Sequence, residues 1–495
     1  MEIVGYVLLG GYTLALIYVT VYCFMQFHLL FHYRKHHAKP KNTNVENFEY
    51  EGEVPFVTIQ LPIFNEKYVI ERLIDNIASL DYPKDRYEIH ILDDSTDETL
   101  DIVKRKVEEY KAKGYLIEQV LRKKRTGFKA GALRDAMNRV QGEFIAIFDA
   151  DFLPTKDFLK RTIPYFKDKN VGVVQSRWEH INQEYSLITR LQAFQLNVHF
   201  SVEQQGRESG DYMLQFNGTA GVWRKETIDA AGGWEADTLT EDLDLSYRAQ
   251  LKGWKIHYLE ELGSPAELPA EMNGLKSQQF RWMKGGAETA KKILPTVWNS
   301  NLGFTKKIHA SLHLMNSSVF LFVFLLGVFS VPLIFFTKAL NMNGNFYAFF
   351  LLSLMSIIAV YFVANNNEYN SRGSKLMSFF RFFLLFPLFL ALSMGLSLHN
   401  SVAVLQGLFG KKTAFVRTPK LNIKTLSDKM VVSNYLKYDV SFITILEGLL
   451  ACYFLFGVYM GIKTGESMFV LFHLLLFFGY AAIFYYSIKH LRYST

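Results

Sequence analysis

Long apolar runs on both sides of a charged central stretch constrain this chain more than any other feature. A helix needs about 20 apolar residues to cross the hydrocarbon core of a bilayer. Of the 495 residues, 50% are hydrophobic and 43 are phenylalanine, which is typical of an integral membrane protein. Six runs are long and apolar enough to be membrane helices: 3–31, 309–336, 346–364, 377–396, 442–462 and 467–488.

Basic residues beside these runs indicate which side of the membrane each loop faces. Arg34, Lys35 and Lys39 follow the first run, and a series of Lys and Arg residues lies within 411–438. Cytoplasmic loops carry an excess of such residues, so both segments are expected in the cytoplasm. Three apolar runs between the central stretch and 411–438 would put these two on opposite sides. We therefore expect one of the three, within 377–410, to be an interfacial or re-entrant helix.

The central stretch alternates strand and helix patterns, which favours a mostly parallel sheet in an α/β domain. The predicted strands are 56–61, 87–92, 144–148 and 171–175, and the predicted helices are 66–80 and 96–113. The chain is then expected to divide into an N-terminal transmembrane helix (1–33), a basic linker (34–53), the α/β domain (54–304), transmembrane or interfacial helices (305–410), a cytoplasmic segment (411–438) and a C-terminal transmembrane pair (439–495).

Carboxylates follow three of the predicted strands. Glu66 comes after the first strand, Asp93 and Asp94 after the second, and Asp149 and Asp151 after the strand 144–148. Ligands of open α/β sheets bind beyond the carboxyl ends of the strands. Paired carboxylates suit Mg²⁺ or Mn²⁺, which would bridge the diphosphate of a nucleotide. The alternative is that these residues are ordinary turn and cap residues.

A basic segment lies between these acidic clusters. Arg122, Lys123 and Lys124 fit a solvated loop better than a phosphate site. Lys129 lies between Gly127 and Gly131, which allow close approach of the backbone, and is the better candidate to meet phosphates.

Further along, Thr240, Glu241 and Asp242 follow a Gly-Gly-Trp turn. A transferase acting on a sugar hydroxyl needs one general base on the acceptor side, and Asp242 is the candidate. The same residues also fit a helix start with Thr240 as N-cap, and both interpretations can hold together.

An Arg and a Trp stand together in the segment Gln278–Trp282. Arg281 suits bidentate binding of a diphosphate, and Trp282 suits stacking on the apolar face of a sugar. Arg and Trp are equally common as anchors of a membrane-surface helix, so composition alone leaves both interpretations open.

These motifs, in this order, resemble the membrane-embedded inverting glycosyltransferases of family 2. The likeness is strongest to the cellulose synthase superfamily, especially the cellulose synthase-like A group that makes mannan and glucomannan. It is carried over residues 54–300 by the motifs above and by LDDSTD (92–97), KAGAL (129–133), VQSRW (174–178), FNGTAG (216–221) and AGGW (231–234). It implies a GT-A, Rossmann-like catalytic domain in the cytoplasm, inserted between α-helical transmembrane segments.

The resemblance also implies roles for single residues. Nucleotide-sugar contacts would come from Glu66, Asp93, Asp94, Lys129 and Asp149, and metal binding from Asp149 and Asp151. Asp242 would be the catalytic base. The diphosphate and the acceptor would be bound by Asn217, Gly218, Thr219, Glu241, Gln278, Arg281 and Trp282.

Residues 415–420 (FVRTPK) are similar to the gating loop of processive synthases, with Thr418 and Lys420 as the matching residues. The bacterial cellulose synthases have Val where this chain has Arg417 and Ala where it has Pro419.

The resulting expectation is a metal-dependent hexosyltransferase in the inner or plasma membrane or, in a eukaryote, the Golgi. It would take UDP- or GDP-sugar, extend a β-glycan of the β-1,4-glucan or mannan type processively, and move it through the bilayer. The net charge of +7 is too modest to indicate nucleic acid as a partner, and no motif specifies an oligomer. The alternatives are a non-processive enzyme acting on a glycolipid, and a pore or transporter with an inactive α/β domain.

Overall fold

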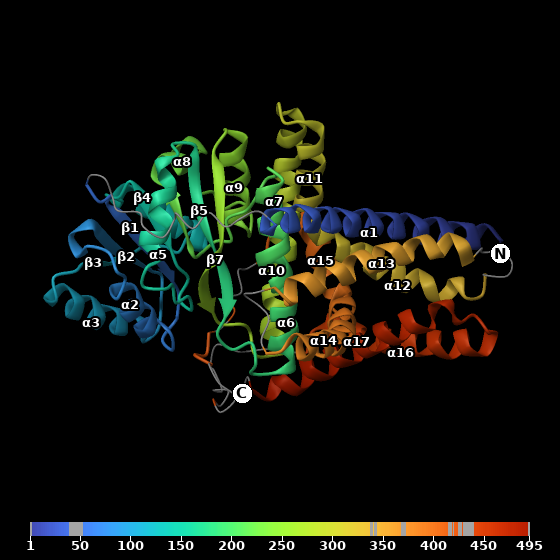
Figure 1. Ribbon diagram of the computed structural model, residues 1–495. Helices are drawn as coiled ribbons and strands as arrows, with labels where there is room; N and C mark the ends of the chain where they lie inside the picture. Colours follow the sequence, from blue (N-terminus) through green and yellow to red (C-terminus); the bar gives the residue numbers. More distant parts are fainter. Residues whose placement is uncertain are drawn as a thin grey trace.

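The computed structural model describes residues 2–38, 53–336, 340, 344–367, 373–413, 418, 420–423, 428 and 440–493. Figure 1 shows an α/β unit at one end of the molecule and a group of long helices at the other. Both the first helix and the last two belong to the long group, so the α/β unit is an insertion between apolar helices.

Seven strands form one sheet in the order β3-β2-β1-β4-β6-β5-β7. Strand β1 is parallel to β2 and β4, β2 is parallel to β3, and β5 is parallel to β7, whereas β6 runs antiparallel to β4 and β5. The predicted α/β sheet is confirmed, and β6 makes it mixed. The strands are β1 (Val57–Ile63), β2 (Tyr87–Asp93), β3 (Leu116–Leu121), β4 (Phe144–Ile147), β5 (Val171–His180), β6 (Gly221–Arg224) and β7 (Lys255–Ala266).

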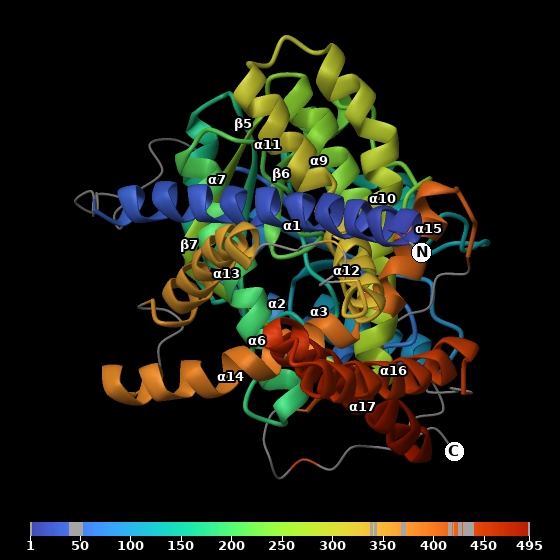
Figure 2. The ribbon, with the colours of Figure 1, turned by 90° about the vertical axis from the view of Figure 1, so that its right-hand side faces the viewer.

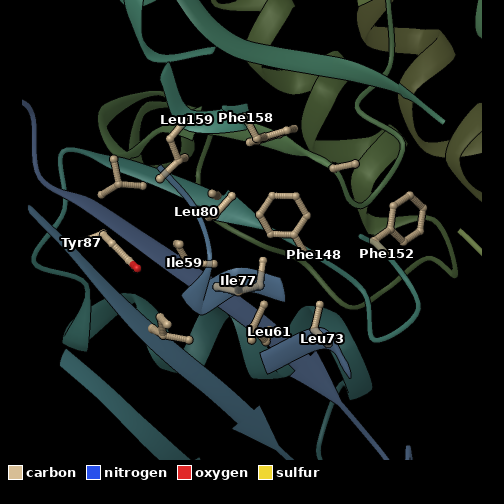
Figure 3. Close-up of a cluster of buried hydrophobic side chains, with 14 of the residues drawn as sticks. Ile59, Leu61, Leu73, Ile77, Leu80, Tyr87, Phe148, Phe152, Phe158 and Leu159 are labelled. Carbon is tan, nitrogen blue, oxygen red and sulfur yellow. The ribbon is translucent and has the colours of Figure 1, made fainter. Parts of the chain in front are cut away.

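Helices cover both faces of the sheet because its central strands are apolar on both sides. Along β4, Phe144 and Ala146 face one buried cluster, whereas Ile145 and Ile147 face the other. The first cluster is closed by α2 (Ile70–Ala78), α3 (Thr99–Ala112) and α5 (Phe158–Thr162). Figure 3 shows part of it, where Leu73 and Ile77 of α2 approach Ile59 and Leu61 of β1. The second cluster is closed by α4 (Phe128–Ala136), α8 (Lys225–Ala230) and α9 (Glu241–Leu251).

A layer of helices lies between the sheet and the apolar helices (Figure 1). It contains α6 (Leu187–Val198), a π-helical turn over His199–Glu203, α7 (Gln204–Ser209), α10 (Met272–Asn299) and α11 (Phe304–Leu314). The apolar run predicted at 309–336 is divided: α11 ends at Leu314, and α12 (Val319–Leu333) begins a separate apolar helix. The lysines and histidines of α11 account for the break, because they favour the membrane surface over its interior.

The long group contains α1 (Glu2–His37), α12, α13 (Gly344–Asn365), α14 (Lys375–Gly395), α15 (Ser397–Leu408), α16 (Phe442–Thr464) and α17 (Val470–Lys489). Figure 2 shows α1 close to α12 and α13, and α14 close to α17. Five helical segments of the described residues are long and apolar enough to cross a membrane, which indicates a membrane protein. Helix α1 extends to His37, into the range expected as a linker, and residues 39–52 lie outside the described residues.

Candidate active site

Three strand ends meet at one edge of the sheet and gather most of the predicted carboxylates. The chain runs from β1 to β2 and β3 on one side, then returns to β4 on the other side of β1. Such a reversal of strand order opens a crevice beyond the carboxyl ends of the strands. A pocket with roughly 720 Å³ of unfilled space lies there, partly open to solvent. Its lining includes these predicted residues: Glu66, Asp94, Lys129, Asp149, Gln278, Arg281, Thr418 and Lys420.

The neighbouring carboxylates of Asp93 and Asp94 have different surroundings. Asp93 is buried: its Oδ1 accepts a hydrogen bond from the Ser95 amide at 2.9 Å, and its Oδ2 accepts one from Gln119 Nε2 at 2.8 Å. It is absent from the described lining of the pocket, whereas Asp94 is part of it. Asp93 therefore holds the turn after β2, and Asp94 is the carboxylate that a ligand can reach.

Arg122 fixes the orientation of Asp94. Its Nε donates to Asp94 Oδ1 at 2.9 Å and its Nη2 donates to Oδ2. The Arg122 side chain is only 10% exposed, so the expected solvated loop is wrong at this residue, although Lys123 and Lys124 are exposed. The basic run could not reveal this role, because the partner of Arg122 lies on another strand end.

Lys129, at the start of α4, lies between Asp149, which follows β4, and the acids Glu241 and Asp242 at the start of α9. Its Nζ lies 2.6 Å from Asp149 Oδ1 and 2.8 Å from the carbonyl oxygen of Gly218. Burial opposes the charged ammonium, but the carboxylates of Asp149, Glu241 and Asp242 outweigh burial and raise the pKa of Lys129. Lys129 therefore keeps its charge between the strand-end carboxylates and the acids of α9.

Asp242 lies in the first turn of α9, where its Oδ1 accepts a hydrogen bond from the Leu243 amide at 2.9 Å. Thr240 occupies the N-cap position but makes no side-chain capping bond, and its hydroxyl instead contacts Thr289 at 3.0 Å. Burial and the neighbouring Glu241 raise the pKa of Asp242 to about 7, against an opposing effect of Lys129. A carboxylate with this pKa is suited to accept a proton near neutral pH.

The loop Asn217–Thr219 lies directly against Asp242. Gly218 has φ +78°, and a Cβ built there would stand 2.9 Å from Asp242 Oδ2. Thr219 is fully buried, and its hydroxyl accepts a hydrogen bond from the Asp149 amide at 2.8 Å. This loop thus connects the strand end of β4 with the predicted base.

Two residues that the sequence did not single out orient Asn217. His199 Nε2 lies 2.9 Å from Asn217 Oδ1, and His199 Nδ1 lies 3.0 Å from Glu203 Oε2 within the same π-helical turn. π-helical turns are rare and often occur at functional sites. Glu203 is buried, and the positive charge of Arg207 and the contact with His199 outweigh its burial and lower its pKa. An isolated His within an amphipathic segment carries no sequence signal for such a role.

The described residues of the predicted gating loop reach the pocket. Lys420 Nζ lies 2.5 Å from Asp151 Oδ1, and Thr418 is part of the pocket lining. Glu267 follows β7 and accepts hydrogen bonds from the amides of Leu421 at 2.9 Å and Asn422 at 3.0 Å. Glu267 was not predicted, since its partners are more than a hundred residues away. The other members of the predicted gating motif, 415–417 and 419, lie outside the described residues.

Helix α10 brings Gln278 and Arg281 to the pocket. Trp282, the next residue, is partly exposed and is not among the described lining residues. Gln278 and Arg281 thus lie beside Lys129 and Asp149 in the described pocket, and the binding roles predicted for them and for Trp282 stay predictions.

A second acidic cluster connects α9 with α10. Lys292 Nζ of α10 contacts Glu235 at 2.6 Å, Asp237 at 2.9 Å and the fully buried Asp244 at 3.0 Å. These carboxylates are close enough together to hold a metal ion, but the ammonium already occupies their centre. The cluster thus fixes α9, which carries Asp242, against α10, which carries Arg281.

Asp149 and Asp151 supply the oxygen donors that Mg²⁺ or Mn²⁺ prefers. Asp149 lines the pocket with its side chain 34% exposed. Asp151 is buried, its Oδ2 accepts a hydrogen bond from the Glu267 amide at 3.1 Å, and its Oδ1 faces the ammonium of Lys420. A buried carboxylate needs a cationic partner, so Asp151 fits a metal ligand as well as an ion-pair partner of Lys420.

Comparison with known proteins agrees with this geometry. The sequence model described as glycosyltransferase-like family 2 matches residues 55–285. Over 261 residues, the chain is 42% identical to glucomannan 4-beta-mannosyltransferase 1 of Oryza sativa subsp. japonica and 41% identical to glucomannan 4-beta-mannosyltransferase 2 of Arabidopsis thaliana. The matches cover 52% of this chain and 50% and 49% of those proteins, so the chain spans about half the length of these curated relatives.

Among solved structures, the fold is similar to that of the mannosyltransferase PcManGT from Pyrobaculum calidifontis, solved in complex with GDP-Man and Mn2+. The TM-score is 0.56 at 18% identity, and the match covers 81% of this chain and 100% of that one. At this identity the likeness establishes the fold. Residues 55–285 of this chain therefore form a glycosyltransferase family 2 domain with a GT-A-like fold.

Proposed function

We propose that the chain is an inverting hexosyltransferase that transfers a sugar from a nucleoside diphosphate donor to a growing β-glycan. The observation that carries the proposal is the position of Asp242. This carboxylate, with its pKa near 7, lies against Gly218 and near the Lys129 ammonium that also contacts Asp149. One base on the acceptor side and cationic groups on the phosphate side are what a single displacement at a sugar carbon requires.

In this mechanism the donor enters the pocket with its nucleotide near Asp94 and Glu66 and its phosphates near Lys129 and Arg281. An acceptor hydroxyl attacks the anomeric carbon from the side opposite the phosphate, and Asp242 accepts the hydroxyl proton. The bond from the anomeric carbon to the phosphate oxygen breaks, and the nucleoside diphosphate leaves with both electrons. The configuration at the anomeric carbon is therefore inverted.

The proposal includes a divalent cation, Mg²⁺ or Mn²⁺, held by Asp149 with Asp151. Bound there, it would neutralise the charge that develops on the diphosphate. Lys129 and Lys420 would continue to supply positive charge at the edges of the pocket. Thr418 and residues 420–423 would lie over the bound nucleotide, with Leu421 and Asn422 held by Glu267.

Similarity to two glucomannan 4-beta-mannosyltransferases supports mannose as the sugar and a β-1,4-linked product. The apolar helices support a reaction at the cytoplasmic membrane surface, with processive elongation and passage of the glycan through the bilayer. Helix α10 suits this coupling, because it carries Arg281 at the pocket and packs against α15.

A donor screen tests the proposal. Purified full-length protein in lipid is given labelled GDP-mannose, UDP-glucose or UDP-N-acetylglucosamine, and the product is sized and analysed for linkage. We expect a polymer rich in β-1,4-linked mannose that is not formed when EDTA is present. Short glycolipids alone would contradict processive synthesis, and no transfer from any of the three donors would contradict the proposed donors.

A further inference from the structure

A second polar cavity lies away from the transferase pocket, between α6, α13 and α14. It has roughly 440 Å³ of unfilled space and an opening to solvent. Its lining includes the amide side chains of Asn197 and Asn365 and the apolar side chains of Phe194, Phe382 and Leu385. Figures 1 and 2 place α6 and α14 together where the long helices meet the α/β unit.

The charged residues that line this cavity are both arginines, Arg190 of α6 and Arg381 of α14. They share one carboxylate: Arg190 Nε lies 3.0 Å from Glu184 Oε2, and Arg381 Nη2 lies 2.5 Å from Glu184 Oε1. Glu184 itself is outside the described lining. Within the described part of the chain, neither guanidinium has another hydrogen-bond or ion-pair partner. Each has five N–H donors, so most remain available and the cavity carries excess positive charge.

The apolar surface beside the cavity favours a lipid over a soluble anion as its ligand. Helix α14 is one of the candidate membrane spans, and Arg381 lies in its second turn. Next to it, the exposed side chains on α14 are large and apolar, including Leu376, Phe380 and Leu384 with more than 60% of their surface exposed. Basic pockets at the ends of membrane helices are suited to anionic head groups. A soluble phosphate would make no use of the adjoining apolar surface.

We propose that this cavity binds the phosphate of an anionic phospholipid, with the acyl chains lying along the exposed face of α14. The phosphate oxygens receive N–H donors from Arg190 and Arg381 in the bidentate manner that guanidinium groups favour. Glu184 keeps the two arginines in place but competes with the phosphate for them. The proposal does not depend on the transfer reaction, since the site is separate from the transferase pocket.

The test uses full-length protein in neutral detergent without sugar donor. Retention of phosphatidic acid and of phosphatidylcholine with the same acyl chains is measured by native mass spectrometry, with the thermal unfolding midpoint as a second readout. We expect phosphatidic acid alone to be retained and to raise the midpoint. Arg190→Gln together with Arg381→Gln should weaken retention by about tenfold or more, since each loses charge-assisted hydrogen bonds. Glu184→Gln should strengthen it.

Arg105→Gln is the matched control, because Arg105 is an exposed arginine of α3 that pairs with Glu71 of α2, far from the membrane helices (Figure 1). It should leave retention unchanged. Equal retention of both lipids, equal retention by wild type and the double variant, or weaker retention by Glu184→Gln would overturn the proposal. So would complete displacement of the lipid by inorganic phosphate at the concentration of the lipid, because the ligand would then be a free phosphate.

Discussion

The ammonium of Lys129 lies 2.6 Å from Asp149 Oδ1. It also lowers the pKa of Asp242 by its charge, while burial and Glu241 raise it to about 7. The same lysine therefore influences the donor side and the base.

The rate of transfer should depend on pH through Asp242. The base acts in its deprotonated form, which predominates above a pKa of about 7. The value of kcat/KM should therefore rise with pH, by about tenfold per unit below the pKa, and level off above it. Rates from initial incorporation of labelled sugar at constant ionic strength give the profile. A rate that stays flat from pH 5.5 to about 8 would contradict this role.

Removal of the Lys129 charge should shift that profile. In Lys129→Gln the carboxylate of Asp242 loses a nearby positive charge, so its pKa should rise above that of the wild type. We expect a lower kcat near neutral pH that partly recovers at higher pH. Lys113→Gln is the control: this half-exposed lysine pairs with Glu109 on α3 and should leave the profile unchanged.

Gly218 should not tolerate a side chain. Gly218→Ala places a Cβ 2.9 Å from Asp242 Oδ2, at a backbone φ of +78°. The loop or the carboxylate must move, and we expect kcat to fall by about 10²-fold, because small displacements of reacting groups are costly. Gly114→Ala is matched in backbone, with φ +81° and open space around its Cβ. It should cost only about 1 kcal/mol of stability and retain activity. Similar activity of the two variants would show that Gly218 is not needed beside Asp242.

The pair of Arg122 with Asp94 should contribute to stability as well as to the site. Both side chains are at most 10% exposed, so Arg122→Ala leaves the Asp94 carboxylate without its two hydrogen bonds and with Arg125, 3.9 Å away, as its remaining cationic neighbour among the described residues. This should cost about 3–5 kcal/mol and lower the unfolding midpoint by roughly 5–10 °C. Arg105→Ala removes an arginine that is 66% exposed, and should cost less than about 1 kcal/mol. The two midpoints are compared by thermal melting in the same detergent, and equal shifts would argue against the pair.

The strands that build the pocket could be predicted from the sequence because they are buried. β1, β2 and β4 are short apolar segments bounded by polar residues, and they appear within two residues of their predicted ends. β3 was missed because it is the sheet edge: Leu116 and Leu121 are exposed, and polar residues lie between them. β6 was missed because its apolar pair, Val222 and Trp223, lies between Gly221 and Arg224, which gives no apolar run like that of β4.

The site could be predicted as a set of carboxylates but not as a network. Strand ends indicated which acids would gather, and alternation along β2 implies that Asp93 and Asp94 face different ways. The partners that fix these groups come from other elements, as with Arg122 and Glu267. Their spacing in the sequence carries no information on these contacts, because packing of the whole domain determines them.

Replacement of the base tests the central claim most directly. Asp242→Asn keeps the size of the side chain and removes its ability to accept a proton. With membranes containing equal amounts of each protein, initial transfer from the donor identified in the screen should fall by about 10²–10⁴-fold. Binding of the labelled donor, measured by filtration, should remain within about twofold of wild type, since Asp242 lies outside the described lining of the pocket. Transfer at the wild-type rate would contradict the account.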